Sequence, residues 1–242
     1  MRLEGDIVKH FLQYFFYYYH PKKGAIPPRN IVSQPIQTTL RNLYPTLLYT
    51  IQSSTLPIAF LACGPSRSGS LPFVSIRASP TLFQIESIRR ARRSIFIQTP
   101  NLNSRPIIKA LKQALLQNVK VTICIPKNMM VLESIVIGWN TTKCCVTLLH
   151  RWARRRPGTS LNVQWFKSDE GQPFVVDNDK SHIKFMVVDE ELVIVGSSNL
   201  DRASACNSGE VNVAISNREF AHQILAAVKR HQRTDFQSME PA

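Results

Sequence analysis

The sequence predicts an α/β fold in which a mixed sheet is flanked by helices. From Pro80 onward, short apolar runs alternate with stretches whose apolar residues recur at helical spacing. Two further apolar runs, separated by the polar turn 189–191, predict a hairpin. Strands that alternate with helices are typical of an α/β sandwich, and the hairpin makes the sheet mixed. With 242 residues, 44% of them hydrophobic, the chain is long enough to bury a sizeable core.

The predicted elements follow one another in a regular order. Helices are expected at 82–93, 107–115, 129–156 and 218–231. Strands are expected at 94–98, 119–125, 161–167, 182–188, 192–195 and 210–215. The third helix should end at Pro157-Gly158, and Asn217 should cap the fourth. The stretch 168–181 is predicted to be a polar loop.

The N-terminal third differs from the rest of the chain. Residues 1–79 hold many of the prolines and have no sustained helical or strand period, which predicts an irregular, Pro-rich segment. The globular domain is therefore expected over 80–236. We find no internal repeat.

The composition favours an anionic partner and a reducing compartment. Lys and Arg number 30 against 16 Asp and Glu, a net charge of +14, which favours nucleic acid, anionic lipid or phosphorylated substrates. Five cysteines without metal-ligand spacing indicate neither a disulfide framework nor a zinc site. Polar residues interrupt the apolar stretch Leu47–Cys63, which argues against a membrane span, and the first residues lack the pattern of a secretory signal. We expect an intracellular protein, cytoplasmic or bound peripherally to a membrane.

One pattern in the sequence carries chemistry. The residues from His182 to Asp189 fit HxKxxxxD, and Gly196-Ser197-Ser198-Asn199 fits GSxN. In these motifs the chain resembles the phospholipase D superfamily, which includes phospholipases, cardiolipin and phosphatidylserine synthases, and some nucleases. The resemblance covers about residues 80–236 and implies a phospholipase D-like sandwich with a single HKD half.

The spacing is consistent with phosphodiester chemistry. Residues i and i+2 share a strand face, so His182 and Lys184 are expected to point at one ligand while Ile183, Phe185 and Val187 pack inward. Ser197 and Asn199 have the same parity. Together with Ser197, the cationic donors of Lys184 and the amide donor of Asn199 are expected to bind the non-bridging oxygens of the phosphate.

The catalytic residues expected are His182, Lys184, Asn199 and Glu210. A neutral imidazole can attack phosphorus to form a phosphohistidine, which makes His182 the nucleophile. The resemblance implies that Glu210 orients this histidine, with Ser197 assisting. Asp189 and Gly196 are assigned structural duty. No metal and no cofactor are expected.

The resemblance covers only one half of a two-motif enzyme. In the family, two histidines face each other across one site, as nucleophile and general acid. None of the remaining histidines lies in an HxK pattern; these are His10, His20, His150, His222 and His231. Either a homodimer builds the site, or another HKD half supplies the second histidine, or the chain is truncated and catalytically incomplete, with residues 1–79 as a remnant of the first half.

Three functions follow from this reading. The preferred one is a phospholipase D-like phosphodiesterase or phosphatidyltransferase that acts on phospholipid, as hydrolase or transphosphatidylase. The second is a nuclease of the same superfamily that works as a dimer on nucleic acid, and the third is an anion-binding half without turnover. Two basic clusters, Arg89–Arg93 and Arg151–Arg156, are candidates for contact with an anionic substrate or membrane surface, although such runs are commonly solvated helix faces.

Overall fold

The computed structural model describes residues 48–52, 57–64, 79–126, 142–167, 181–231 and 233–235. Its strands are β1 (Leu48–Gln52), β2 (Pro57–Cys63), β3 (Ser94–Gln98), β4 (Lys120–Ile125), β5 (Ser160–Lys167), β6 (Phe185–Val188), β7 (Leu192–Gly196), β8 (Glu210–Ser216) and β9 (Arg233–Asp235). Its helices are α3 (Ser79–Arg90), α4 (Arg105–Leu116), α6 (Thr142–Arg154), α7 (Arg202–Cys206) and α8 (Arg218–His231).

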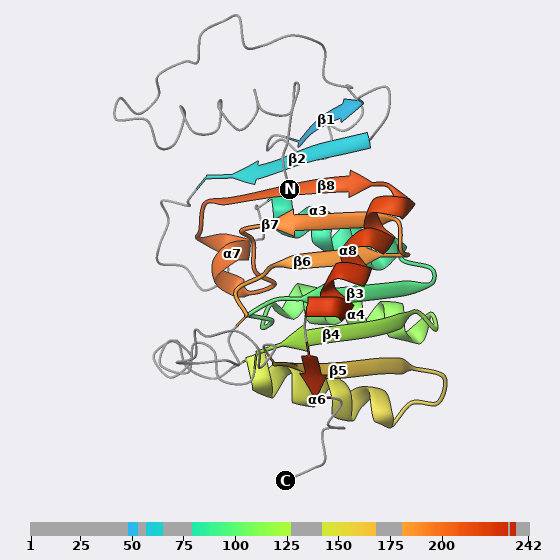
Figure 1. Ribbon diagram of the computed structural model, residues 1–242. Helices are drawn as coiled ribbons and strands as arrows, with labels where there is room; N and C mark the ends of the chain where they lie inside the picture. Colours follow the sequence, from blue (N-terminus) through green and yellow to red (C-terminus); the bar gives the residue numbers. More distant parts are fainter. Residues whose placement is uncertain are drawn as a thin grey trace, which may run out of the picture.

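The nine described strands form one sheet in the order β1-β2-β8-β7-β6-β3-β4-β5-β9 (Figure 1). Strands β3, β4 and β5 are parallel, and every other pair is antiparallel. The helices α4 and α6 make the crossovers between the parallel strands, as parallel pairing requires. The predicted α/β fold with a mixed sheet is therefore confirmed.

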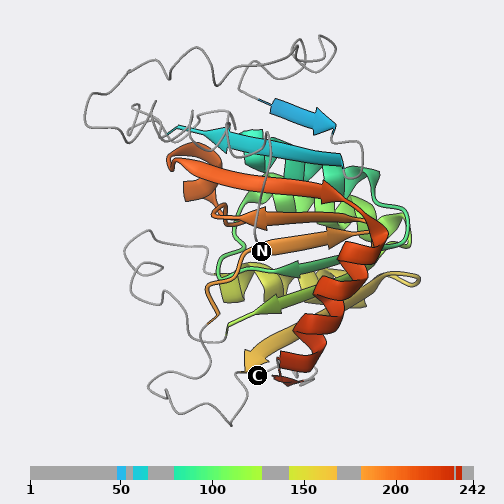
Figure 2. The ribbon, with the colours of Figure 1, turned by 45° about the horizontal axis from the view of Figure 1, so that its top comes forward.

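The helices cover the two faces of the sheet unequally. Helices α3, α4 and α6 lie on one face, and α8 crosses the other (Figures 1 and 2). The larger core includes Ile107, Leu111 and Leu115 of α4, all fully buried. Burial of each such side chain contributes about 1.5–3 kcal/mol, so this helical layer holds the sheet in place. Residues Phe185 and Val187 of β6 face α8, where Ala221 completes the smaller core.

Most predicted elements agree with the structure to within a few residues. The strand at 94–98 is found at those residues, and the hairpin of β6 and β7 is present. Asn217 does cap α8, because its Oδ1 accepts a 2.7 Å hydrogen bond from the Phe220 N–H. The predicted loop at 168–181, apart from Ser181, and the first part of the predicted helix at 129–156 lie outside the described residues.

Two expectations are corrected. The sequence indicated no strand within residues 1–79, but β1 and β2 lie there, and β2 pairs with β8 inside the sheet. Phe60 to Cys63 are all buried. Strand β2 therefore lacks the alternation of apolar and polar residues that marks a strand with one face exposed to solvent. The division of the chain at residue 79 remains a prediction.

Among the described residues, no helix is long and apolar enough to cross a membrane.

The second correction concerns residues 182–184. They precede β6, because β3 ends at Gln98 and the antiparallel ladder begins only at Phe185. Strand alternation therefore does not apply to them. Ile183, expected to pack inward, is 46% exposed, whereas Phe185 and Val187 are buried as expected.

Asp189 ties the β6–β7 hairpin to the start of β3. The turn holds Asp189 and Glu190 at positive φ (55° and 56°). The Asp189 carboxylate accepts hydrogen bonds from the backbone N–H groups of Arg92, Arg93 and Ser94 at 2.7–3.1 Å. Partial burial raises the pKa of this carboxyl, but the three backbone donors and the Arg93 charge outweigh it and leave the pKa below its ordinary value.

Asp189→Asn should lower the free energy of unfolding by about 1–2 kcal/mol at pH 7, since charge-assisted hydrogen bonds become neutral ones. Asn tolerates positive φ, so the turn itself is preserved. The pKa is depressed in the folded state, so the stabilisation is present above the ordinary Asp pKa of about 3.9 and is lost as the pH falls through the folded value. Urea unfolding from pH 7 to pH 3 should show the difference shrink, with Glu190→Gln as the control. A difference independent of pH would contradict this account.

Candidate functional site

The motif residues lie at one edge of the sheet. Phe185, at the start of β6, pairs with Gln98 at the end of β3 and with Val195 near the end of β7. Gly196 ends β7 and pairs with Asn212 near the start of β8. We call this edge, with residues 181–184 and 196–201 that extend from it, the site edge. Residues far apart in sequence thereby share one location.

Ser197 connects the end of β7 to Glu210 at the start of β8. Its backbone N–H donates to the Val211 carbonyl, and its Oγ accepts from the Val211 N–H, both at 2.9 Å. The same Oγ donates a 2.5 Å hydrogen bond to Oε2 of Glu210, which is only 6% exposed. A buried carboxylate requires such compensation, so the serine fixes the position of the acid.

Lys184 is the half-buried cation of the site edge. Its Nζ donates a 2.8 Å hydrogen bond to the carbonyl of His182. Burial lowers the pKa of this ammonium, and the charges of Glu210 and Asp201 act in the opposite direction. Burial outweighs the two carboxylates and leaves the pKa of Lys184 below its ordinary value, and the ammonium lies near both acids at the site edge.

Asp201 organises the polar groups of the site edge, and the sequence analysis did not identify it. Its Oδ2 accepts from the side-chain amides of Asn101 at 3.2 Å and Asn199 at 3.3 Å. Its Oδ1 accepts from the Ser204 N–H at 2.8 Å, which caps α7. The pattern Asp201-Arg-Ala-Ser204 is an N-cap signature that could have revealed it. The loop after β3 is thus bonded to the GSxN segment.

Asn199 is hydrogen-bonded through both its backbone and its side chain. Its backbone N–H donates to Oγ of Ser204 at 3.1 Å, and its side-chain amide donates to Asp201. Its Oδ1 is buried and has no hydrogen-bond partner within the described part of the chain. An unpaired buried acceptor costs about 1–3 kcal/mol, so the remaining hydrogen bonds of Asn199 and Asp201 are needed to hold this residue in place.

His182 lies at the solvent-facing side of the site edge. Its side chain is exposed, and among the described residues it makes no hydrogen bond. The hydrogen bond of Glu210 is made to Ser197 and not to the imidazole. The structure therefore brings together the predicted residues Lys184, Ser197, Asn199 and Glu210, with His182 two residues before Lys184 at the open side.

The other described histidines lie away from this edge. His222 is on α8 and contacts Glu190 at 3.2 Å, beside the hairpin turn at the opposite end of β6. His150 lies on α6, where burial and then Arg154 lower its pKa. Within the described ranges, no group of three or more His, Cys, Asp or Glu residues could hold a metal ion.

Comparison with known proteins identifies one family. A family model described as "Cardiolipin synthase, PLD-like domain" matches residues 84–232. The major cardiolipin synthase ClsA of Bacillus subtilis is 29% identical over 146 residues, which is 60% of this chain and 26% of that protein. A cardiolipin synthase of Staphylococcus aureus strain N315 is 28% identical over 145 residues, which is 59% of this chain and 25% of that protein. The chain thus matches only about a quarter of the length of these curated relatives.

Solved structures share the fold. Phosphatidylserine synthase of Haemophilus influenzae Rd KW20 aligns with a TM-score of 0.62 at 13% identity, over 98% of this chain and 56% of that one. Nuc of Salmonella typhimurium, a phospholipase D family member, aligns with a TM-score of 0.50 at 19% identity, over 73% of this chain and 97% of that one. These likenesses concern the architecture alone.

Gly196 permits the close approach of β7 and β8 at the site edge. A Cβ at this position would overlap the Val211 carbonyl oxygen and Oδ1 of Asn212, and would lie 2.6 Å from the Asn212 Cα. Gly196→Ala should therefore lower the free energy of unfolding by about 2–4 kcal/mol, because backbone atoms must move apart. Urea unfolding measures the change. A loss below about 0.5 kcal/mol, the range of neutral surface changes, would contradict this packing.

Proposed function

This chain belongs to the phospholipase D superfamily, and on that premise we propose that it cleaves or exchanges the phosphodiester of a phospholipid through a phosphohistidine at His182. The observation that carries the proposal is the meeting of Lys184, Ser197, Asn199 and Glu210 at one edge of the sheet beside His182. The likeness to cardiolipin synthases favours a lipid substrate.

The first step is attack of an imidazole nitrogen of His182 on phosphorus. A P–N bond forms, and the P–O bond to the leaving alcohol breaks. Negative charge grows on the non-bridging oxygens during this step, and the Lys184 ammonium and the Asn199 amide are the donors proposed to stabilise it. Fixed donors of this kind contribute about 10²–10³ in rate each.

The second step releases the phosphoryl group to water or to an alcohol. The incoming hydroxyl attacks phosphorus, the P–N bond breaks, and the imidazole is regenerated. Water gives hydrolysis, and a lipid hydroxyl gives transfer. Ser197 fixes Glu210, and we propose that this buried carboxylate orients the imidazole during the cycle.

The leaving alkoxide needs a proton, and we propose that a second imidazole supplies it in the first step and accepts the proton of the incoming hydroxyl in the second. None of the other histidines lies in an HxK pattern, so a second copy of this chain or a separate HKD half would provide that acid. Loss of a general acid typically costs about 10²–10⁴ in rate. Full activity is therefore expected of an assembly that contains two such motifs, and not of the single chain.

A nuclease function is the second candidate, favoured by the net charge of +14. The negative backbone of nucleic acid is attracted by such a charge, and its binding falls steeply with salt. The same cleavage chemistry applies to its phosphodiesters. Parallel assays with a lipid and an oligonucleotide distinguish the two.

His182→Ala should abolish turnover of fluorescent phosphatidylglycerol and of bis-nitrophenyl phosphate, by roughly 10³-fold or more, because the nucleophile is lost. Acid quenching of the wild-type reaction with labelled substrate should trap a phosphoprotein, and the variant should give none. The readouts are product release and label retained on the protein.

His222→Ala is the matched control, since it removes an exposed histidine at the opposite end of the sheet. It should retain wild-type turnover and labelling. Turnover that survives in His182→Ala would exclude the proposed nucleophile. Absence of turnover and of a trapped adduct in the wild type, for both lipid and oligonucleotide, would leave an anion-binding half.

A further inference from the structure

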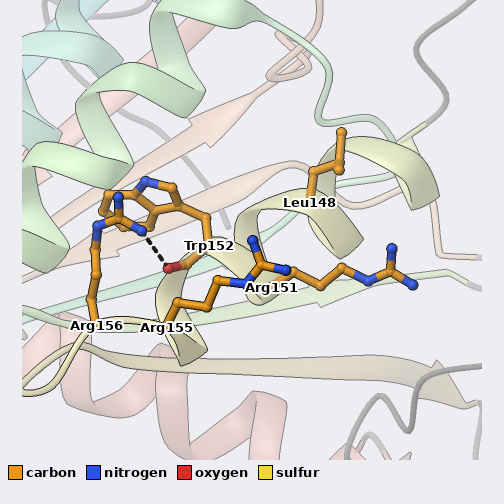
Figure 3. Close-up of a pocket in the computed structure, with 5 residues that line it drawn as sticks. All are labelled: Leu148, Arg151, Trp152, Arg155 and Arg156. Carbon is orange, nitrogen blue, oxygen red and sulfur yellow. Dashed lines mark hydrogen bonds between the residues drawn. The ribbon is translucent and has the colours of Figure 1, made fainter.

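The outer face of the helical layer combines exposed cations with exposed apolar side chains. Leu148 and Arg151 lie three residues apart on α6, which places them on one side of the helix, and Arg155 follows in the turn directly after the end of α6. Together with Trp152 and Arg156 they line a pocket (Figure 3). On α4, Lys112 and Leu116 are one turn apart. We call these seven residues the basic helical face.

Trp152 joins the two helices at this face. Lys112 Nζ lies 5.2 Å from the centroid of its indole, and the Arg156 guanidinium lies 4.2 Å from the same centroid. Arg156 also donates a 2.9 Å hydrogen bond to the Trp152 carbonyl (Figure 3). Two like charges are thereby held against one ring, and an anion placed between them and Arg151 would be attracted by all three.

Among the described residues, no carboxylate forms a salt bridge with the cations of this face. Between residues 105 and 156 the sequence has ten Lys and Arg but a single acid, Glu133, and α4 and α6 contain no acidic residue. Within the described part of the chain, the salt bridges involve Glu86, Glu190 and Glu191, and none reaches the basic helical face. The face therefore presents a positive potential that no described carboxylate offsets.

The apolar side chains decide which anionic partner fits. Leu116 is 60% exposed and Leu148 is 56% exposed, two of the three large hydrophobic residues that are exposed among those described. Leucines at such positions gain nothing from the phosphates of a nucleic acid. They gain free energy when they enter the headgroup region of a bilayer, where cations also meet lipid phosphates and where Trp is favoured.

We propose that the basic helical face docks the protein on an anionic membrane surface. Arg151, Arg155 and Lys112 contact lipid phosphates, while Leu116 and Leu148 enter the interface beside Trp152. The face is separate from the site edge, because α4 and α6 both follow the ends of β3 and β4 in the chain and run back along the sheet. Lys112 and Arg151 lie in the second halves of these helices, and Arg155 and Arg156 follow the end of α6. Docking does not require the chemistry of His182.

The test is sedimentation of the full chain with vesicles of equal phosphatidylglycerol and phosphatidylcholine, compared with phosphatidylcholine alone. The wild type should bind the anionic vesicles preferentially, and added salt should weaken the binding. Arg151→Glu/Arg155→Glu should reduce the affinity by at least about tenfold. Leu148→Ser should weaken binding at low and high salt alike, because it removes an uncharged contribution.

The matched control is Arg218→Glu/Arg230→Glu, which makes the same change in net charge on α8, across the sheet. It should bind anionic vesicles within about threefold of the wild type, since distant surface charges are screened beyond the Debye length. His182→Ala should bind like the wild type, which separates docking from the proposed catalysis. Equal losses in the two double variants, or unchanged binding by Arg151→Glu/Arg155→Glu, would overturn the proposal.

Fluorescence anisotropy with duplex DNA tests the other anionic partner. If Arg151→Glu/Arg155→Glu lost DNA binding while its vesicle binding stayed at the wild-type level, the face would be a nucleic-acid surface and the membrane proposal would be wrong.

Discussion

The close pairing of β7 with β8 at Gly196 is the constraint on which the site depends. Only a residue without Cβ fits between Val211 and Asn212 there. Because the strands meet so closely, Ser197 reaches both the Val211 backbone and the Glu210 carboxylate, and the Asn212 side chain accepts from the Ser198 N–H at 3.1 Å. The segment that follows leads to Asp201, whose carboxylate accepts hydrogen bonds from the side chains of Asn101 and Asn199. The close pairing of β7 with β8 thus helps to fix the positions of these polar groups.

The two faces of the sheet support this edge from different directions. Helices α3, α4 and α6 bury the larger core, and α8 covers Phe185 and Val187 on the opposite face. Asp189 fastens the far end of the hairpin to the start of β3. The strands that carry the motif are therefore fixed at both ends, which keeps the donors of the site edge in a constant arrangement. Preorganised donors of this kind are what stabilisation of a developing charge requires.

The sequence predicted the parts of the structure that depend on local pattern. Periodic apolar residues located β3, β4 and the two crossover helices, and the resemblance to the phospholipase D superfamily implied that Ser197 would assist Glu210. Three features depended on contacts between distant parts of the chain and were missed. Strand β2 lacks the alternating pattern of a strand with one exposed face because its last four residues are all buried. Residues 182–184 lie outside the paired part of β6 because its partner strand β3 ends at Gln98. The N-cap pattern at Asp201 is local, but its hydrogen bond to Asn101, a hundred residues away, depends on the fold and was missed.

The proposed chemistry needs two copies of the motif in one site, with one imidazole as nucleophile and the other as acid. Mixed assemblies of wild-type and His182→Ala chains, allowed to exchange and then assayed on fluorescent phosphatidylglycerol, test it most directly. If two chains share one site, a mixed pair lacks one of the two imidazoles, and activity should fall with the square of the wild-type fraction. Activity that falls in proportion to the wild-type fraction would mean that each chain works alone, and would exclude a site shared between two chains.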